Sequence, residues 1–153
     1  MKTAVIISDT HGNFRAIDKL LPIMMENDHV FHLGDHEKDI WQYRKELNNK
    51  ILSVSGNCDG GGSEEVVEIE GVKILLTHGN KYGVKESLYK LSLRAKELGV
   101  STVFYGHTHL SDIKVVDGVS FVNPGSLSNY GVKSYCYAVF HQGKVVCKIV
   151  DVD

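Results

Sequence analysis

The chain has 153 residues, with 17 Lys or Arg against 19 Asp or Glu, a formal net charge of −2 when histidine is neutral. This length and an apolar fraction of 42% fit one globular domain over residues 1–153 and exclude a disordered or fibrous chain. The charge balance supplies no basic footprint for a nucleic-acid partner. Three cysteines cannot close a disulfide framework, and the sequence contains no signal-peptide pattern or membrane-length apolar run. We therefore expect a cytoplasmic protein with no membrane partner.

Five apolar runs of strand length predict strands that are buried on both faces of a sheet. They cover residues 3–8, 30–33, 51–54, 72–77 and 100–105. The runs are continuous and rich in β-branched residues rather than alternating, which is typical of strands with both faces covered.

Helical patterns lie between these runs. Asn13 is a good N-cap for a first helix, and Pro22 within the same pattern predicts a kink or an early end. Residues 37–47 predict a second short helix, and residues 85–98 a third that ends at Gly99. The expected inward-facing residues are Phe14, Ile17, Leu20 or Leu21, Met24, Leu88, Leu91, Ala95 and Leu98. The alternation of strands and helices in the first half predicts a parallel sheet with right-handed crossovers.

Three two-residue turn signals in the second half each separate two strand-like runs and predict hairpins. They are Glu70-Gly71, Asp117-Gly118 and Gln142-Gly143. The extra strands exceed what one doubly wound sheet needs, so we expect an α/β fold with two stacked mixed sheets flanked by helices. The last turn would place Cys136 and Cys147 on one face of the terminal hairpin but not directly opposite, which favours buried free thiols.

Metal-competent side chains follow five of the predicted strands. They stand in the segments Asp9-Thr10-His11, Gly34-Asp35, Gly56-Asn57, His78-Gly79 and Gly106-His107-Thr108-His109. Because the carboxyl ends of strands meet at one edge of an open α/β sheet, we expect these side chains to converge. Oxygen and nitrogen donors without a thiolate suit Mn, Fe, Zn or a similar divalent ion. Seven ligands exceed what one ion takes, whereas two ions that share a carboxylate would use all of them.

The charge of such a site predicts the class of its substrate. Two carboxylates cannot neutralise two divalent ions, even with a bridging hydroxide, so the site would be cationic in a mildly acidic protein. A small phosphorylated molecule is the expected partner, because two ions can stabilise both the attacking and the leaving oxygen of a phosphoryl group.

In this order and spacing, the motifs D-x-H, GD, GN, HG and GHTH resemble those of the calcineurin-like metallophosphoesterases, in particular their small bacterial and archaeal phosphodiesterase-like members. The match runs from residue 9 to 109, and the segment Asn123-Pro124-Gly125-Ser126 extends it. The resemblance implies a four-layer α/β/β/α sandwich. It also implies two divalent ions per chain, with Mn expected first and Fe, Zn, Ni or Mg as alternatives.

The resemblance further implies a role for each motif residue. Asp9, His11 and His109 would hold one ion, Asn57, His78 and His107 the other, and Asp35 would bridge them. The candidate catalytic residues are Asp35, Asn57, His107 and His109. The implied reaction is phosphoester hydrolysis by in-line attack of a metal-bound hydroxide.

Three positions depart from the family's pattern. Cys58 stands where many members have a His that protonates the leaving group, and a thiol is a weaker proton donor at neutral pH. This substitution favours phosphodiesters with undemanding leaving groups over monoesters. Asn80 replaces a second His, and Asn129-Tyr130 replaces a Pro-Arg pair that would contact phosphate. Asp59 is available as a partner for a ligating His.

Four further histidines lie outside the five motifs. His29, His32 and His141 have no Asp or Gly partner in the pattern and are expected to be structural or on the surface. His36 follows Asp35 and is a candidate to line the pocket.

A phosphomonoesterase is one alternative function. Another is a non-catalytic interaction scaffold, because the superfamily also resembles a retromer subunit in which the fold serves binding. A homo-oligomer is left open.

Overall fold

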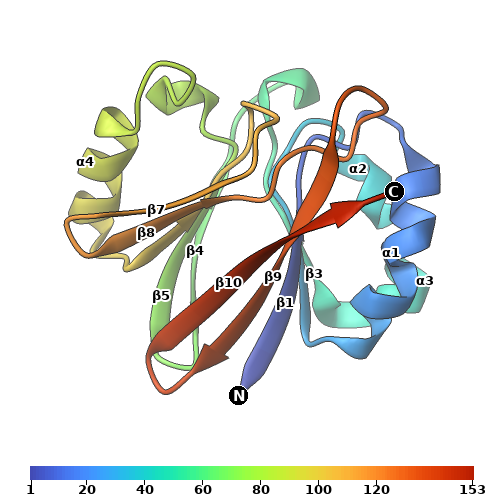
Figure 1. Ribbon diagram of the computed structural model, residues 1–153, viewed down its shortest axis with the longest axis horizontal. Helices are drawn as coiled ribbons and strands as arrows, with labels where there is room; N and C mark the ends of the chain where they lie inside the picture. Colours follow the sequence, from blue (N-terminus) through green and yellow to red (C-terminus); the bar gives the residue numbers. More distant parts are fainter.

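Two five-stranded sheets are stacked with helices on their outer faces in the computed structural model, which describes residues 1–153 (Figure 1). The first sheet has the order β10 (Lys144–Val152), β9 (Lys133–His141), β1 (Lys2–Ile7), β2 (His29–His32) and β3 (Ile51–Ser53). The second has the order β4 (Glu64–Ile69), β5 (Val72–Thr77), β6 (Thr102–Phe104), β8 (Val119–Asn123) and β7 (Asp112–Val116). The predicted α/β/β/α sandwich is confirmed.

Both sheets are mixed. In the first, β1, β2 and β3 pair in parallel as predicted, while β9 and β10 run antiparallel. All three predicted hairpin turns form, at Glu70, Asp117 and Gln142, where φ is 52°, 49° and 48°. In each turn the following glycine also has a positive φ, so the pairs adopt the mirror-image turn that matches strand twist.

Helix α1 (Phe14–Glu26) begins as predicted, since Asn13 Oδ1 accepts a hydrogen bond from the Ala16 N–H at 3.3 Å. Of the two alternatives predicted at Pro22, the early end is wrong, because the helix continues to Glu26. Pro22 removes one backbone hydrogen bond, but the apolar face that includes buried Ile17 and Met24 continues past it. The prediction for Phe14 is also wrong, because its side chain is exposed at the first turn.

The region predicted as one second helix, residues 37–47, forms two separate turns. These are α2 (Lys38–Trp41) and α3 (Arg44–Leu47), followed by the 3-10 turn η1 (Asn48–Lys50). Tyr43 separates them with φ −104° and ψ 15°, outside the helical range. Hydrophobic spacing alone could not locate this interruption.

Helix α4 (Tyr89–Leu98) is shorter than the predicted range of 85–98 and starts later, after the 3-10 turn η3 (Asn80–Tyr82). Its end is as predicted, with Gly99 in the left-handed conformation at φ 68°. Its buried residues Leu91 and Ala95 face the second sheet, also as predicted. None of the helices combines the length and the hydropathy needed to cross a membrane.

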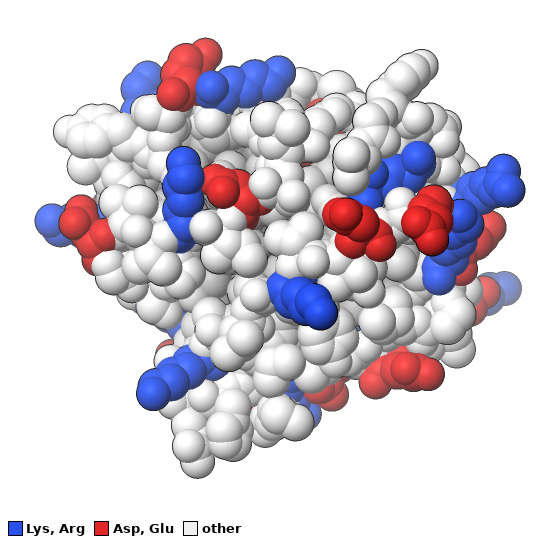
Figure 2. Space-filling model, in the orientation of Figure 1, with Lys and Arg blue, Asp and Glu red and all other residues white.

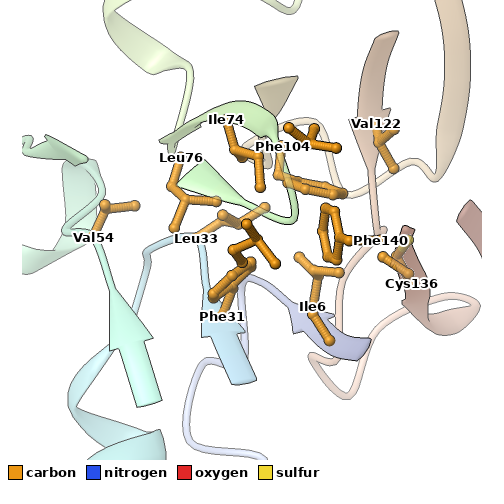
Figure 3. Packing of buried hydrophobic residues seen from close by; sticks show 14 residues of the cluster. Ile6, Phe31, Leu33, Val54, Ile74, Leu76, Phe104, Val122, Cys136 and Phe140 are labelled. Carbon is orange, nitrogen blue, oxygen red and sulfur yellow. The ribbon is translucent and has the colours of Figure 1, made fainter. Parts of the chain in front are cut away.

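The main core lies between the two sheets. Residues such as Phe31 and Leu33 from the first sheet pack against Ile74 and Phe104 from the second (Figure 3). Two further clusters fill the spaces between each sheet and its helices. The largest of the three clusters is therefore shared by both sheets.

The prediction for the two cysteines of the terminal hairpin is confirmed in part, because Cys136 is buried but Cys147 is only half-buried. Cys136 pairs with Ile149, and Cys147 with Ala138, so the two thiols are diagonal neighbours on one face. Both are free.

Candidate metal centre

The loops that carry the predicted ligands lie at the upper edge of the sheets in Figure 1, where β1, β2, β5 and β6 end. Six of the seven predicted ligands form two groups of three, and in each group the ligand atoms lie within 4.8 Å of one another. The groups are Asp9, His11 and His109, and Asp35, His78 and His107. The structure therefore brings these six residues together, while their role as ligands stays a prediction.

Asp35 connects the two groups. Its Oδ2 lies 3.8 Å from His11 Nε2 and 3.4 Å from His78 Nε2. Asp9 Oδ1 lies 3.1 Å from His109 Nε2 and 3.9 Å from His78 Nε2. Because one carboxylate oxygen faces a histidine of each group, the six side chains form one continuous cluster.

The residues present fit divalent cations. His11 Nε2 is buried and has no hydrogen-bond partner, and buried Asp9 Oδ1 has only the approach of His109 Nε2 at 3.1 Å, an arrangement that is costly without a compensating group. The Nδ1 of His78 lies 2.8 Å from the Leu33 carbonyl oxygen, to which it must donate. His78 Nε2 faces Asp35 Oδ2 at 3.4 Å, the side from which a histidine ligand would bind a cation. Cations bound here would satisfy Asp9 Oδ1 and His11 Nε2.

The pKa shifts of Asp9 and His107 favour metal binding, whereas that of His109 opposes it. Burial raises the pKa of Asp9, but the neighbouring His109 and His78 rings and the Ser8 hydroxyl outweigh it, so the pKa lies below its usual value. Burial, together with the adjacent His78, lowers the pKa of His107, which leaves its ring neutral. The Asp9 carboxylate raises the pKa of His109, so an ion would compete with a proton for that ring.

Asn57, the seventh predicted ligand, is exposed at the start of the 3-10 turn η2 (Asn57–Asp59). Its side-chain amide donates to Cys58 Sγ at 3.7 Å and makes no hydrogen bond with the six clustered side chains. The loop itself packs on the cluster, because the Cys58 N–H donates to Asp35 Oδ1 at 2.9 Å. Its place as a ligand remains a prediction.

Asp59 holds two motif loops against each other. Its carboxylate accepts hydrogen bonds at 2.8 Å from the backbone N–H groups of Asp35, His36 and Gly56. These backbone bonds outweigh burial and hold its pKa below the usual value. The prediction that Asp59 partners a ligating histidine is wrong, because the converging amides occupy its oxygens.

Asp39, which the sequence motifs did not reveal, anchors the first loop. It is buried, and its Oδ2 accepts hydrogen bonds at 2.7 Å from the Thr10 hydroxyl and the Gly12 N–H.

His32 connects the loops that carry Thr10 and Gly34. Its Nδ1 accepts a hydrogen bond from the Gly34 N–H at 3.0 Å, so Nε2 carries the proton and donates it to Thr10 Oγ1, also at 3.0 Å. Burial lowers the pKa of His32 to about 4, which keeps this ring neutral. His32 is structural, as predicted.

The backbone of the site is strained. Ten non-glycine residues have a positive φ, and six of them stand in the motif loops, namely Asp9, His11, Asp35, His36, His107 and His109. Such conformations persist only where the surroundings impose them, and they gather at functional sites.

The predicted extension of the motif supplies part of that support. Asn123 Nδ2 donates to the Gly106 carbonyl at 3.2 Å and to Thr108 Oγ1 at 2.9 Å. Ser126 Oγ donates to the Asp9 carbonyl at 2.9 Å. A Cβ at Gly106 would overlap the Ser8 hydroxyl, so only glycine allows this loop to approach β1 so closely.

The remaining histidines lie where the sequence suggested. His36 lines the edge of the cluster, with its ring centroid 5.1 Å from that of His11. His29 stacks on Phe31, and His141 is exposed at the end of β9.

The chain matches the calcineurin-like phosphoesterase superfamily domain over residues 1–144. It belongs to this family. A probable metallophosphoesterase of Bacillus subtilis is 35% identical over 127 residues, which are 80% of this chain and 73% of that protein. A phosphodiesterase of Methanocaldococcus jannaschii is 30% identical over 145 residues, 82% of this chain and 84% of that one.

Solved structures agree with this assignment. The structure of an archaeal phosphodiesterase superposes with a TM-score of 0.78 at 25% identity, covering 97% of this chain and 99% of that one. Vps29 of Entamoeba histolytica, in complex with Zn²⁺, gives a TM-score of 0.75 at 25% identity over 97% of this chain and 98% of that one. Vps29 of Chaetomium thermophilum, at 18% identity, covers 99% and 97% with a TM-score of 0.77 and shows the common fold.

Proposed function

We propose that this protein is a dinuclear metal-dependent phosphoesterase that hydrolyses phosphodiesters. The observation that carries the proposal is the position of Asp35, whose Oδ2 lies within 4 Å of a histidine from each ligand group. A carboxylate placed in this way is suited to bridge two cations about 3.5–4 Å apart.

The ligand assignment follows the two groups. Asp9, His11 and His109 would hold one ion, and His78, His107 and Asn57 the other, with Asp35 shared between them. When bound, the ions would bind phosphoryl oxygens as Lewis acids and lower the pKa of an attacking water. Mn²⁺ is the ion we propose first, because the donors are carboxylate and imidazole without sulfur.

The chain's own residues position this chemistry. Asp59 and Asp39 fix the backbone of the loops that carry Asp35 and His11, and the Leu33 carbonyl orients His78. Preorganisation of this kind keeps ligands in place without reorganisation during the reaction.

Two observations support diesters over monoesters. The 30% identical relative from Methanocaldococcus jannaschii is named a phosphodiesterase. Cys58, a weaker proton donor than the family's histidine, stands beside Asp35. A phosphomonoesterase is the alternative reaction.

A protein-interaction scaffold is the second candidate function, favoured by the similarity of the fold to Vps29 structures. Retention of all seven ligand types favours catalysis instead.

For the enzyme we propose a small phosphorylated substrate, a cytoplasmic location on the basis of its unpaired cysteines, and no nucleic-acid partner. Figure 2 shows basic and acidic side chains interspersed on one face, without the basic stripe that a phosphate backbone requires.

Chelation and metal replacement test the proposal. The purified protein is expected to hold about two ions per chain, in line with a dinuclear site. Treatment with EDTA should abolish hydrolysis of bis-(p-nitrophenyl) phosphate, and added Mn²⁺ should restore it. p-Nitrophenyl phosphate, assayed in parallel, measures the monoester preference. A protein that binds no metal and hydrolyses neither ester would support the scaffold.

A further inference from the structure

A cavity of about 420 Å³ lies directly beside the metal cluster, on the side of His109. His109, Leu110 and Ser111 line it from the loop after β6, Tyr130 and Val132 from the loop that leads into β9, and Ser134 from the start of β9 itself. Its volume lies within the range of small-molecule sites. Because His109 Nε2 is 3.1 Å from Asp9 Oδ1, one wall of the cavity is part of the cluster itself.

Three of the most exposed apolar side chains of the protein surround this cavity. Leu110 is 72% exposed, Tyr130 86% and Val132 73%. Single exposed apolar residues are ordinary, but several around one hollow mark a surface that binds something. Their position next to the metal ligands distinguishes them from exposed Val115 and Val146 on β7 and β10.

The cavity contains no Lys, Arg, Asp or Glu. On another side of the cluster, a smaller cavity of about 270 Å³ is lined by His36, Glu37, Lys38, Cys58 and Asp59. The two flanks of the cluster therefore differ in chemistry. The first suits an uncharged group, whereas the second suits a polar one.

The walls of the apolar cavity are fixed to the metal loops. The Leu110 N–H donates to Thr108 Oγ1 at 3.1 Å, and Thr108 in turn accepts from Asn123. On the other wall, Ser134 Oγ donates to the Pro124 carbonyl at 2.7 Å. These bonds hold the backbone at the base of each loop, from which the apolar side chains project beside the cluster.

We propose that this cavity receives an uncharged aromatic or apolar ester group of the substrate, and that Leu110, Tyr130 and Val132 select for it. The inference rests on the proposed function, because it places the phosphoryl group at the metal cluster and the organic group against the neighbouring wall. The substrate class is thus a phosphoester with at least one apolar or aromatic arm. Contact with an aromatic ring would raise affinity rather than change the chemistry of the phosphoryl group.

Binding of two phosphonates to the Mn²⁺-loaded protein tests the selection without requiring turnover. Phenylphosphonate and methylphosphonate present the same phosphonate group and differ only in the organic arm. Calorimetry should show that the wild-type protein binds phenylphosphonate at least about 10-fold more tightly than methylphosphonate, as expected for one aromatic group in an apolar pocket. The double variant L110S/Y130S should lose this preference. The matched control V115S/V146S removes exposed apolar groups elsewhere and should retain it.

Hydrolysis of bis-(p-nitrophenyl) phosphate and methyl p-nitrophenyl phosphate provides the second readout. Compared with the wild-type protein, L110S/Y130S should have a higher KM for bis-(p-nitrophenyl) phosphate and a similar kcat. Equal affinity of the wild-type protein for both phosphonates, or an undiminished preference in L110S/Y130S, would overturn the proposal. The proposal would also be overturned if the wild-type protein were a dimer and L110S/Y130S a monomer with unchanged selectivity between the two phosphonates. A phenyl preference that L110S/Y130S abolishes, in a protein that hydrolyses neither ester, would support the cavity and refute the proposed activity.

Discussion

Replacing Asp35 by Asn is expected to abolish most of the phosphoesterase activity, with kcat/KM lower on the order of 10²–10³-fold. The amide keeps the shape of the carboxylate and the acceptor for the Cys58 N–H. It loses the negative charge that faces both His11 and His78. Bound metal per chain should fall in the same preparation, as measured by elemental analysis.

Thermal unfolding separates this effect from misfolding. Without metal, Asp35 and Asp9 are two buried carboxylates that face the same histidines, so their mutual repulsion destabilises the folded chain. In EDTA, D35N should therefore melt at the wild-type temperature or above it. Mn²⁺ at about 100 times its Kd should stabilise the wild-type protein by about 2.7 kcal/mol, and D35N by much less.

The exposed Asp151 provides the control, because D151N removes a carboxylate that has no contact with the cluster. This variant should retain activity, bound metal and the Mn²⁺ response. Unchanged turnover and metal content in D35N would exclude Asp35 as the bridging ligand.

Replacing Asp59 by Asn should weaken the site from a distance and also destabilise the apo protein. The carboxylate accepts three backbone hydrogen bonds, from Asp35, His36 and Gly56. An amide offers only one oxygen, and its NH₂ group would face an N–H donor. Leaving such partly buried amides unpaired costs about 1–3 kcal/mol of the free energy of unfolding. Metal affinity should fall about 10–100-fold, as is typical when the support of a ligand is lost.

Denaturant unfolding in EDTA, followed by a Mn²⁺ titration, measures both effects of D59N. The variant should have a lower midpoint than the wild-type protein even without metal, unlike D35N. A variant with wild-type stability and wild-type affinity for Mn²⁺ would show that Asp59 does not hold the two loops together.

The sequence was sufficient to predict the layers of the fold and the convergence of the motif loops. Continuous apolar runs identified the buried strands, and turn pairs such as Glu70-Gly71 identified the hairpins, because both signals act over a few residues. The placement of Asp9, Asp35 and His78 at one edge followed from the common direction of the strands that precede them.

Features that depend on tertiary contacts could not be predicted. Whether Pro22 ends helix α1 depends on the packing of the helix face, and nothing local to the proline reveals it. Asp39 lies in no motif, yet its buried carboxylate holds Thr10 and Gly12. The role of Asp59 required knowledge of which backbone amides converge on it.

The central claim is that one carboxylate joins two cations. Anomalous diffraction at the Mn absorption edge, from crystals grown with Mn²⁺, tests it most directly. The expected result is two peaks about 3.5–4 Å apart, each bonded to an oxygen of Asp35. A single peak, or two peaks of which only one is bonded to Asp35, would contradict it.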